Sequence, residues 1–381
     1  MKVLVLGGCG FIGSAVVRDL IKAEDVETVM VKDRQIDMRY MHEKVQKSKK
    51  LQLQSLDITN NDKLKKAIAG SDIVINCVGP YYRFGVQIAQ AALEVGVNYL
   101  DVCDDFEVTK RFIEELDRPA KEKGLSVCTG FGAEPGFGNV AMRYAADRLD
   151  EVDEVAVYSA VAMNDIGGGG ALIHMLHALV EPSWQYLGGR LVQVPPGSGV
   201  EEIEFPEPYG KCSVCYFGHT EPATVPRYIK GIKNVVVKLF FLPLWVNQLY
   251  RDLANAGFLS EEPIEIQGIK TSSRDLIAQM SIKCGSFTEK VKEATTEPVL
   301  IVVKGREKNR EVTYKYYSSG GMAPGTGVAA SLFAQMVWRG EIKDKGVVTP
   351  EQVDPKSFFG HFGKRGFFLH EEKTSIEDIR F

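Results

Sequence analysis

The 381-residue sequence lacks any hydrophobic run long enough to span a membrane as a helix. Its most apolar stretch, residues 235–250 (VVVKLFFLPLWVNQLY), falls short of the roughly 20 residues that a spanning helix needs, and it contains Lys238 and Pro243. We therefore expect this stretch in the core or at a subunit interface. The N-terminal sequence MKVLVLGGCG has too short an apolar run for a signal peptide, so we expect a cytoplasmic protein with no membrane partner.

The sequence also lacks a large excess of charge of one sign, and its number of cysteines is odd. Its 46 basic and 50 acidic residues leave a formal net charge of −4, and the basic residues are spread out apart from short runs such as residues 44–50. No basic face for nucleic acid is expected. The seven cysteines, an odd number scattered through the chain, favour free thiols in a reducing compartment over a disulfide framework. The remaining composition is that of an ordinary folded protein.

A glycine-rich turn directly follows the first predicted strand. Residues 2–6 (KVLVL) fit a buried strand, and the turn GGCGFIG at residues 7–13 leads into the helical pattern SAVVRDLIKA. In the fingerprint Gly8-x-Gly10-x-x-Gly13, the three glycines make the tight turn, let a pyrophosphate approach the backbone and let the helix pack on the strand. Phosphate would bind at the N-terminus of that helix. The predicted ligand is a dinucleotide.

Asp33 indicates which dinucleotide to expect. It ends the second predicted strand, 20 residues beyond Gly13, where an acid binds the ribose 2′-hydroxyl, and this favours NAD. Arg34 follows directly and can hold a 2′-phosphate, so NADP stays open as the alternative. The expected cofactor-binding residues all lie in the glycine turn or at strand ends: Gly8, Gly10, Phe11, Ile12, Gly13, Asp33, Arg34, Asp57, Cys77, Val78 and Gly79.

The length and the pattern of elements predict two domains. Alternating strands and helices in the first part of the chain predict an α/β, Rossmann-type doubly wound parallel sheet. From about residue 152 longer predicted strands, at residues 154–161, 299–304 and 311–317, indicate a second α+β domain built on a mixed sheet. We expect the dinucleotide-binding domain at residues 1–135, a substrate and dimerisation domain at 136–324, and a return of residues 325–381 to brace the first domain.

Three loops at the carboxyl ends of predicted strands carry unusual residues: GPYYRFG (79–85), DVCDD (101–105) and GFGAEPGFGN (130–139). In a doubly wound sheet such loops converge on the ligand. Asp101, Asp104 and Asp105 crowd negative charge at one strand end, which raises a pKa or attracts a cationic substrate. The candidate proton-transfer residues in the three loops are Tyr81, Asp101, Asp104 and Glu134.

Each of these residues also has a structural alternative. Tyr81 can simply pack its ring, and one of Asp104 and Asp105 is expected to cap the helix that begins near Glu107. Gly136 and Asn139, in the third loop, are expected to hold substrate.

The stretch FGHTEPATVPR, residues 217–227, is the candidate substrate loop of the second domain. We expect Arg227 to bind a carboxylate through its guanidinium fork, His219 to carry a proton, and Glu221 and Thr224 to contact substrate. The alternative is a solvated loop whose charges pair with one another.

No metal site is expected. Cys212-x-x-Cys215 lacks a second ligand pair, and His174-x-x-His177 sits on an apolar helical stretch.

The motifs GGCGFIG, VGPYYRFG, YLDVCDD and GFGAEPGFGN, in this order, resemble the saccharopine dehydrogenase family. The likeness covers nearly the whole chain, with looser matches at FGHTEPATVPR and GMAPGTGVAAS. It implies NAD(P)-dependent oxidation of a C–N bond next to a carboxylated amino-acid framework, or reduction of the corresponding imine. It also implies a substrate-site role for Tyr81. Glu134 departs from the apolar residue of lysine 6-dehydrogenases, and Asp33 departs from the basic residue of NADP-using saccharopine reductases.

Three functional hypotheses follow. The first is an oxidoreductase that acts through an imine on a small-molecule amino-acid substrate such as saccharopine, lysine or carboxynorspermidine. The second is a non-catalytic NAD-binding sensor or partner protein. The third is a lipid-modifying reductase with a membrane contact at residues 235–250, which is disfavoured because the apolar residues there do not segregate to one face. The aromatic and apolar segment 239–250 is also expected to form a homodimer interface.

Overall fold

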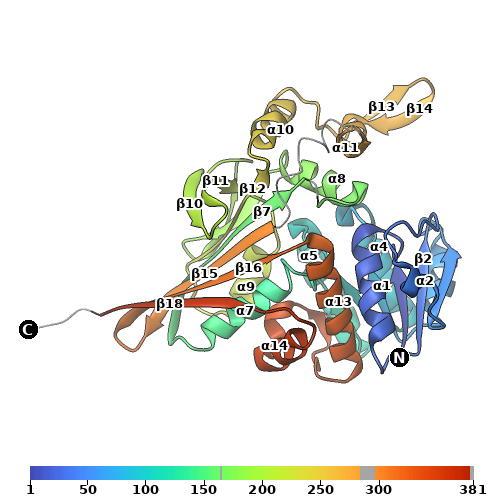
Figure 1. Cartoon of the computed structure of the whole chain (residues 1–381), viewed down its shortest axis with the longest axis horizontal. Coiled ribbons are helices and arrows are strands. Elements are labelled where there is room, and N and C mark those ends of the chain that lie inside the picture. Colours follow the sequence, from blue (N-terminus) through green and yellow to red (C-terminus); the bar gives the residue numbers. More distant parts are fainter. Residues whose placement is uncertain (164, 284–296, 378–381) are drawn as a thin grey trace, which may run out of the picture. The chain divides into compact units, whose positions relative to one another are not determined.

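The computed structural model describes residues 1–163, 165–283 and 297–377 of the chain. The chain divides into two compact units, each with its own large sheet (Figure 1). The first unit comprises Met1–Val140 and Met322–Phe368, and the second comprises Ala141–Gly321 and Leu369–Phe381.

The first unit is built on a seven-stranded parallel sheet in the order β17-β6-β5-β4-β1-β2-β3. The strands are β1 (Lys2–Leu6), β2 (Thr28–Asp33), β3 (Leu51–Ser55), β4 (Ile73–Asn76), β5 (Asn98–Asp101), β6 (Ser126–Cys128) and β17 (Gly346–Val348). Their residues are mostly apolar and buried, as expected for parallel strands covered on both faces. The strand order reverses between β1 and β4, and such a switch point is where doubly wound sheets bind ligands. The predicted Rossmann-type sheet is confirmed.

Helices of the first unit follow the strands in alternation. They are α1 (Phe11–Lys22), α2 (Glu43–Gln46), α3 (Asn61–Ile68), α4 (Tyr81–Val95), α5 (Phe106–Arg111), a π-helical turn (Phe112–Leu116), α6 (Asp117–Glu122), α13 (Met322–Trp338) and α14 (Pro355–Gly363). Helix α7 (Phe137–Ala146) crosses into the second unit. Helix α13 returns to pack on α1, so closely that a methyl group at Gly327 would lie 2.5 Å from Cβ of Ala15. The rings of Phe333 and Phe358 stack between α13 and α14 at 4.5 Å.

The second unit is built on a nine-stranded mixed sheet, as predicted. Its main path runs β10-β11-β12-β7-β15-β16-β18, and β8 and β9 extend it beside β12. The strands are β7 (Glu151–Ala162), β8 (Ser183–Leu187), β9 (Arg190–Val194), β10 (Glu201–Phe205), β11 (Gly210–Tyr216), β12 (Asn234–Leu242), β15 (Glu297–Glu307), β16 (Arg310–Gly320) and β18 (His370–Glu377). Helices α8 (Gly169–Ala178), α9 (Glu221–Tyr228), α10 (Trp245–Asn255) and α11 (Ser273–Lys283) and a separate hairpin, β13 (Pro263–Ile266) with β14 (Ile269–Ser272), complete the unit.

Two predictions about this unit need correction. Residues 325–381 were expected to return and brace the first domain; the chain up to Phe368 does belong to the first unit, but β18 pairs with β16 of the second along its whole length (Figure 1). Ion pairs such as Lys373 with Glu307 join it to the sheet. Residues 217–227 were expected to form a loop, but the chain from Glu221 is helix α9. Pro222 lies in the first turn of α9, where a missing N–H costs no hydrogen bond.

The apolar stretch 235–250 is divided between the buried strand β12 and the start of α10. Among the described residues, no helix combines the length and the apolar character needed to cross a membrane. The six cysteines in the described ranges are all free thiols, and the seventh, Cys284, lies outside those ranges.

Candidate active site

In the turn after β1, Gly13 and Gly10 differ in how much space the surrounding protein leaves for a side chain. A methyl group at Gly13 would lie 2.2 Å from the carbonyl oxygen of Gly7, so close packing alone excludes a side chain there. At Gly10 the nearest atom to such a methyl group is the same carbonyl oxygen, at 3.2 Å, and the backbone is extended. Packing within the protein therefore demands glycine at 13 far more strongly than at 10. A ligand that approaches the backbone gives a separate reason for glycine at 10.

Helix α1 begins at this turn with its N-terminus open. Gly10 is the N-cap residue, so no side chain caps the helix, and the first turn contains no acidic residue. The unpaired N–H groups and the positive end of the helix dipole favour an anion at this place. The turn therefore fits the pyrophosphate of a dinucleotide.

Asp33, at the end of β2, is held against the same turn. Its Oδ2 accepts a hydrogen bond from the backbone N–H of Cys9 at 3.1 Å. Burial, reinforced by the negative charge of Asp33, raises the pKa of the Cys9 thiol. Arg34 follows and is exposed. The carboxylate is thus held beside the glycine turn, and its contact with a ribose hydroxyl stays a prediction.

The chain after β4 lies on the other side of the glycine turn. A methyl group at Gly7 would lie 2.8 Å from the carbonyl oxygen of Cys77 and 3.2 Å from Cγ2 of Val78. Burial raises the pKa of the Cys77 thiol to about 12. The structure therefore brings these two predicted cofactor residues beside the turn. The carboxylate of Asp57, by contrast, accepts hydrogen bonds from the N–H and hydroxyl of Thr59, at 3.0 and 2.7 Å, and its cofactor role stays a prediction.

Asp101 lies at the end of β5 and is completely buried. Its Oδ1 accepts hydrogen bonds from the N–H groups of Gly130, at 2.9 Å, and Cys103, at 3.1 Å. Its Oδ2 accepts one from the hydroxyl of Tyr99 at 2.9 Å. Burial raises the pKa of Asp101 to about 6, although these hydrogen bonds oppose the shift. The carboxylate joins the loop after β5 to the loop after β6.

A second part of this network lies at the end of β4. The amide nitrogen Nδ2 of Asn76 donates to the Tyr99 hydroxyl oxygen at 3.0 Å, and Oδ1 of Asn76 accepts from the N–H of Val78 at 3.0 Å. The hydroxyl of Tyr81 donates to the carbonyl oxygen of Asn76 at 2.9 Å. Burial raises the pKa of Tyr81 well above its usual range. The hydroxyl of this predicted catalytic residue is thus engaged by the strand that precedes it.

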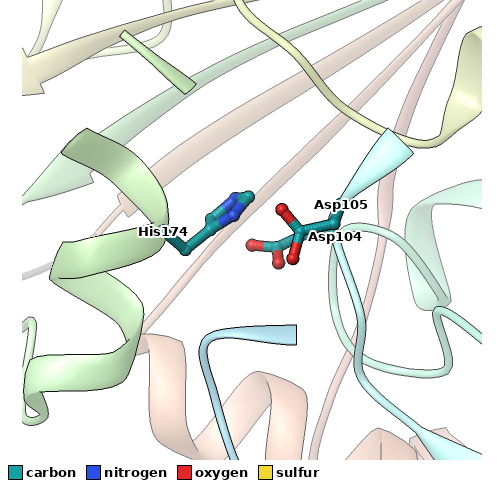
Figure 2. Close-up of side chains that lie close together, drawn as sticks. All are labelled: Asp104, Asp105 and His174. Atoms are coloured by element: carbon teal, nitrogen blue, oxygen red, sulfur yellow. The ribbon is translucent and has the colours of Figure 1, made fainter. Parts of the chain in front are cut away.

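The two other aspartates of the DVCDD run differ in exposure. Asp105 is buried, and its Oδ2 accepts a hydrogen bond from the N–H of Tyr82 in the first turn of α4 at 3.0 Å. As expected, an aspartate stands at the N-cap of the helix near Glu107, since Asp105 is the N-cap residue of α5, but its side chain makes no capping hydrogen bond there and stabilises α4 instead. Asp104 is half-buried. Figure 2 shows both carboxylates on the chain that follows β5, and it shows His174 on α8.

Glu134, the charge in the glycine-rich stretch, folds back onto its own turn. A methyl group at Gly138 would lie 1.8 Å from Oε2 of Glu134, so the carboxylate occupies the space that this glycine leaves at the start of α7. Both carboxylate oxygens are shielded from solvent. A negative charge at this helix end is favourable. A proton-transfer role for Glu134 stays a prediction.

Gly136 and Asn139, the predicted substrate contacts of this loop, serve the fold. Oδ1 of Asn139 accepts from the N–H of Gly136, and its Nδ2 donates to Oε1 of Glu351, both at 2.8 Å. Asn139 and Glu351 are completely buried. The structure therefore uses the Asn139 side chain to fix the turn.

The second unit brings His219 and Glu221 together at the start of α9. Nδ1 of His219 lies 2.5 Å from Oε2 of Glu221, and both residues are buried. Thr224 is also buried, and its hydroxyl donates to the carbonyl oxygen of Thr220 at 3.4 Å. Arg227 is exposed on α9. Within this stretch the structure therefore brings the side chains of His219 and Glu221 into contact.

The two remaining motifs, His174-x-x-His177 and Cys212-x-x-Cys215, lie on α8 and β11 of the second unit. His174 is buried on α8, and Nδ1 of His177 lies 2.9 Å from Nη1 of the buried Arg274. Cys212 and Cys215 lie on β11, where residues three apart point to opposite faces, so the two thiols cannot bind one ion.

Sequence reasoning missed Asn76, Tyr99 and Glu351. For Asn76 a signal was present, because it is a polar residue inside the apolar run IVINCV of a strand that must be buried on both faces. Tyr99 and Glu351 gave no comparable signal, since their partners are distant in sequence.

Comparisons with known proteins agree with this geometry. The family described as saccharopine dehydrogenase NADP binding domain matches residues 3–128, and the saccharopine dehydrogenase C-terminal domain matches residues 172–367. A carboxyaminopropylagmatine dehydrogenase of Synechocystis sp. is 24% identical over 398 residues, which cover 97% of each chain. A carboxynorspermidine synthase of Vibrio cholerae is 26% identical over 341 residues, which cover 82% of this chain and 80% of the relative.

Two solved structures share the fold over nearly the whole chain. Saccharopine dehydrogenase (L-Glu forming) from Saccharomyces cerevisiae superposes with a TM-score of 0.68 at 16% identity, covering 98% of this chain and 99% of that one. Homospermidine synthase from Legionella pneumophila, in complex with NAD, gives a TM-score of 0.64 at 12% identity, covering 98% and 91%. At these identities the likeness concerns the fold alone.

Proposed function

The chain belongs to the saccharopine dehydrogenase family and is a saccharopine dehydrogenase-like NAD(P)-dependent oxidoreductase, and on this premise we propose that it uses NAD to oxidise a secondary amine next to a carboxylate. The reverse reaction is the reduction of the corresponding imine. The names of two relatives that match most of the chain, carboxyaminopropylagmatine dehydrogenase and carboxynorspermidine synthase, support a carboxylated polyamine or opine-type substrate.

The observation that carries the cofactor assignment is the hydrogen bond between Cys9 and Asp33. It holds a carboxylate where the adenosine ribose of a dinucleotide lies relative to such a turn. There the carboxylate would accept a hydrogen bond from the free 2′-hydroxyl of NAD and would repel the 2′-phosphate of NADP. The nicotinamide cofactor supplies hydride chemistry, and the protein supplies orientation, electrostatics and proton transfer.

For proton transfer we favour Asp104 and His219. Tyr81 and Asp101 have their polar atoms engaged inside the first unit, and the carboxylate of Glu134 lies over its own turn. Asp104 is a half-buried carboxylate on the chain that follows β5, where negative charge attracts a cationic amine, and His219 is oriented by a buried carboxylate. Arg227 is exposed and has the fork geometry that binds a substrate carboxylate.

We further propose a cytoplasmic homodimer. The free thiols favour a reducing compartment. At the start of α10, the side chains of Leu244, Trp245 and Leu249 are 54%, 44% and 37% exposed, which is unusual for large apolar residues close together in the chain. Light scattering that gives the mass of a dimer supports this proposal, and a monomeric mass contradicts it.

The first experiment follows the absorbance of reduced nicotinamide with the purified protein. NAD and NADP are tested separately with saccharopine, carboxynorspermidine, carboxyaminopropylagmatine and lysine. We expect turnover with one carboxylated secondary amine, faster with NAD than with NADP. Absence of turnover with all four amines, while NADH still binds, would favour the non-catalytic NAD-binding protein.

Two substitutions test the proton-transfer residues. Asp104→Asn and His219→Asn are each expected to lower kcat by about a hundredfold, the usual size of a general acid–base contribution, with little change in NADH affinity. Glu114→Gln, an exposed carboxylate on the first unit, is the matched control. Activity unchanged in both test variants would exclude both residues.

A further inference from the structure

A single network of hydrogen bonds, buried from Asn76 onward, connects the ends of three neighbouring strands in the first unit. We call it the strand-end relay. From β4 to β6, its members are Val78, Asn76, Tyr99, Asp101, Cys103 and Gly130. Asn76, Tyr99 and Asp101 are each completely buried. The loops that it connects are the three that follow β4, β5 and β6 at the carboxyl edge of the sheet, where a doubly wound fold binds its ligand.

The direction of the relay is set by the amide at 76 and the carboxylate at 101. The N–H of Val78 can only donate, so it occupies the carbonyl oxygen of the Asn76 amide and directs Nδ2 toward Tyr99. The Tyr99 oxygen therefore accepts from Asn76, and its own proton needs an acceptor, which is Oδ2 of Asp101. At the other end two backbone N–H groups converge on Oδ1 of Asp101. With the amide at 76, an acceptor with no proton of its own is thus required at 101.

Resting on the proposed function, we infer that Asp101 is a positioning residue: through the strand-end relay it holds the three loops in the geometry in which nicotinamide and substrate meet. Direct proton transfer is disfavoured, because both carboxylate oxygens accept hydrogen bonds from the fold and the side chain has no exposed surface. Buried polar networks specify a unique arrangement only when every member has its partner.

Asp101 is the residue of the strand-end relay that carries a negative charge, because the titratable groups around it stay neutral. The titratable side chains that bear on it electrostatically are Tyr81, Tyr99, Cys77, Cys103 and Cys128. Burial raises the pKa of each of these hydroxyl and thiol groups, so all five stay neutral near pH 7.

The direction of the relay gives an unusually sharp test, because it can be reversed. Asp101→Asn presents a second donor to the Tyr99 oxygen and leaves the Tyr99 proton without an acceptor. Asn76→Asp alone places two carboxylates on one hydroxyl. The double variant restores every hydrogen bond, since Tyr99 then donates to the carboxylate at 76 and accepts from the amide at 101. The charge moves from β5 to β4, and the shapes of the side chains are unchanged.

Hydrogen–deuterium exchange of the cofactor-free protein measures how readily the three loops open, and it requires no assumption about the substrate. We expect each single variant to exchange about tenfold faster at residues 77–82, 102–105 and 129–137, which corresponds to the loss of one buried hydrogen bond, and the double variant to return to the wild-type rate. Asp117→Asn is the matched control, because Asp117 also accepts a backbone hydrogen bond in this unit, from Val347, but lies outside the relay.

Steady-state kinetics then link the loops to catalysis. In each single variant kcat is expected to fall about tenfold. The KM for NAD is expected to change little, because the glycine turn is untouched. The double variant is expected to recover kcat.

Two results would overturn the inference. One is a double variant that exchanges as fast as the single variants although circular dichroism shows it folded. The other is Asp101→Asn with wild-type exchange and lost kcat, since Asp101 would then act in the chemistry itself. If the wild type turns over no amine, the proposed function fails, but the exchange measurement still decides whether the relay holds the loops.

Discussion

The backbone N–H of Cys9 donates a hydrogen bond to Oδ2 of Asp33 across 3.1 Å, and this bond ties the glycine turn to the end of β2. The carboxylate is therefore fixed relative to the turn that would carry the pyrophosphate. Removing it with Asp33→Ala is expected to weaken NADH binding about tenfold to a hundredfold, the value of one charge-assisted hydrogen bond. NADPH binding should weaken less or improve, because the repulsion of its 2′-phosphate disappears. Titration of nicotinamide fluorescence gives both dissociation constants.

Arg34→Ala is the control for this experiment. Arg34 is exposed beside Asp33, and a guanidinium there can bind the 2′-phosphate of NADPH, a group that NADH lacks. We expect this variant to bind NADH as the wild type does. If Asp33→Ala lowered the affinity for both cofactors equally, Asp33 would serve the turn alone and would not select the cofactor.

The glycines at 10 and 13 are expected to fail in different ways. Gly13→Ala places a methyl group 2.2 Å from the carbonyl oxygen of Gly7, so it should lower the free energy of unfolding by about 3 kcal/mol. Gly10→Ala should change stability by less than about 1 kcal/mol but weaken NADH binding at least tenfold, because its methyl group projects where the pyrophosphate approaches. Urea denaturation and fluorescence titration separate the two effects.

Gly70→Ala is the matched control for both glycine variants, since a methyl group there meets no atom within 4 Å. It should leave the affinity for NADH unchanged. Equal losses of stability in Gly10→Ala and Gly13→Ala would contradict the division of roles within the turn.

Local patterns were sufficient to predict the alternating strands and helices of the first unit up to β6, but not its seventh strand, β17. The apolar run of β1, the spacing of its glycines and Asp33 are set by contacts between residues near in sequence, so periodicity and turn chemistry carry the signal. The order of strands and helices then allows few topologies, and the doubly wound sheet is one of them. The family resemblance had the same basis and is confirmed.

The candidate site was less predictable, because its hydrogen bonds join residues far apart in the chain. Glu134 and Asn139 were singled out from the sequence. No local pattern, however, shows that Gly138 leaves space for the Glu134 carboxylate, or that the Asn139 amide donates to Glu351. The start of α9 was predicted as a loop for a local reason. Its two prolines indicate a loop, yet a proline in the first turn of a helix costs no hydrogen bond.

Arg148 joins the last strand to the body of the second unit. Its guanidinium lies between the rings of Tyr144 and Tyr314, at 4.0 and 4.2 Å, and Nη1 donates to Oε1 of Glu371 on β18 at 3.0 Å. The hydrogen bond from Arg148 holds the pKa of Glu371 below its usual range. A stacked, partly buried guanidinium paired with a carboxylate contributes more than an exposed ion pair.

Arg148→Ala is therefore expected to lower the free energy of unfolding of the second unit by about 2 kcal/mol. Arg310→Ala is the control, since its ion pair with Glu377 also joins β16 to β18 but is more than half exposed on both sides, and it should cost less than about 1 kcal/mol. Urea denaturation, together with exchange of the β18 amides, measures both. Equal costs would mean that the tyrosine rings contribute nothing.

The pH dependence of stability offers a test of the buried charge at Asp101. Its pKa is raised to about 6 in the folded protein, mainly by burial, whereas an unfolded aspartate titrates at about 3.9. Between these values the folded state binds more protons than the unfolded state, so this group makes the free energy of unfolding fall as pH rises from about 4 to about 6. Two pKa units correspond to about 3 kcal/mol at most.

Asp101→Asn has no such group, so the free energy of unfolding of the wild type minus that of the variant should shrink by about 2 to 3 kcal/mol between pH 4 and pH 7. Groups with lowered pKa values, such as Glu371, are the same in both proteins and cancel in the difference. The double variant Asn76→Asp/Asp101→Asn should titrate as the wild type does, because it keeps one buried carboxylate in the relay. A difference that stays constant with pH would mean that Asp101 is not the group that ionises in this range.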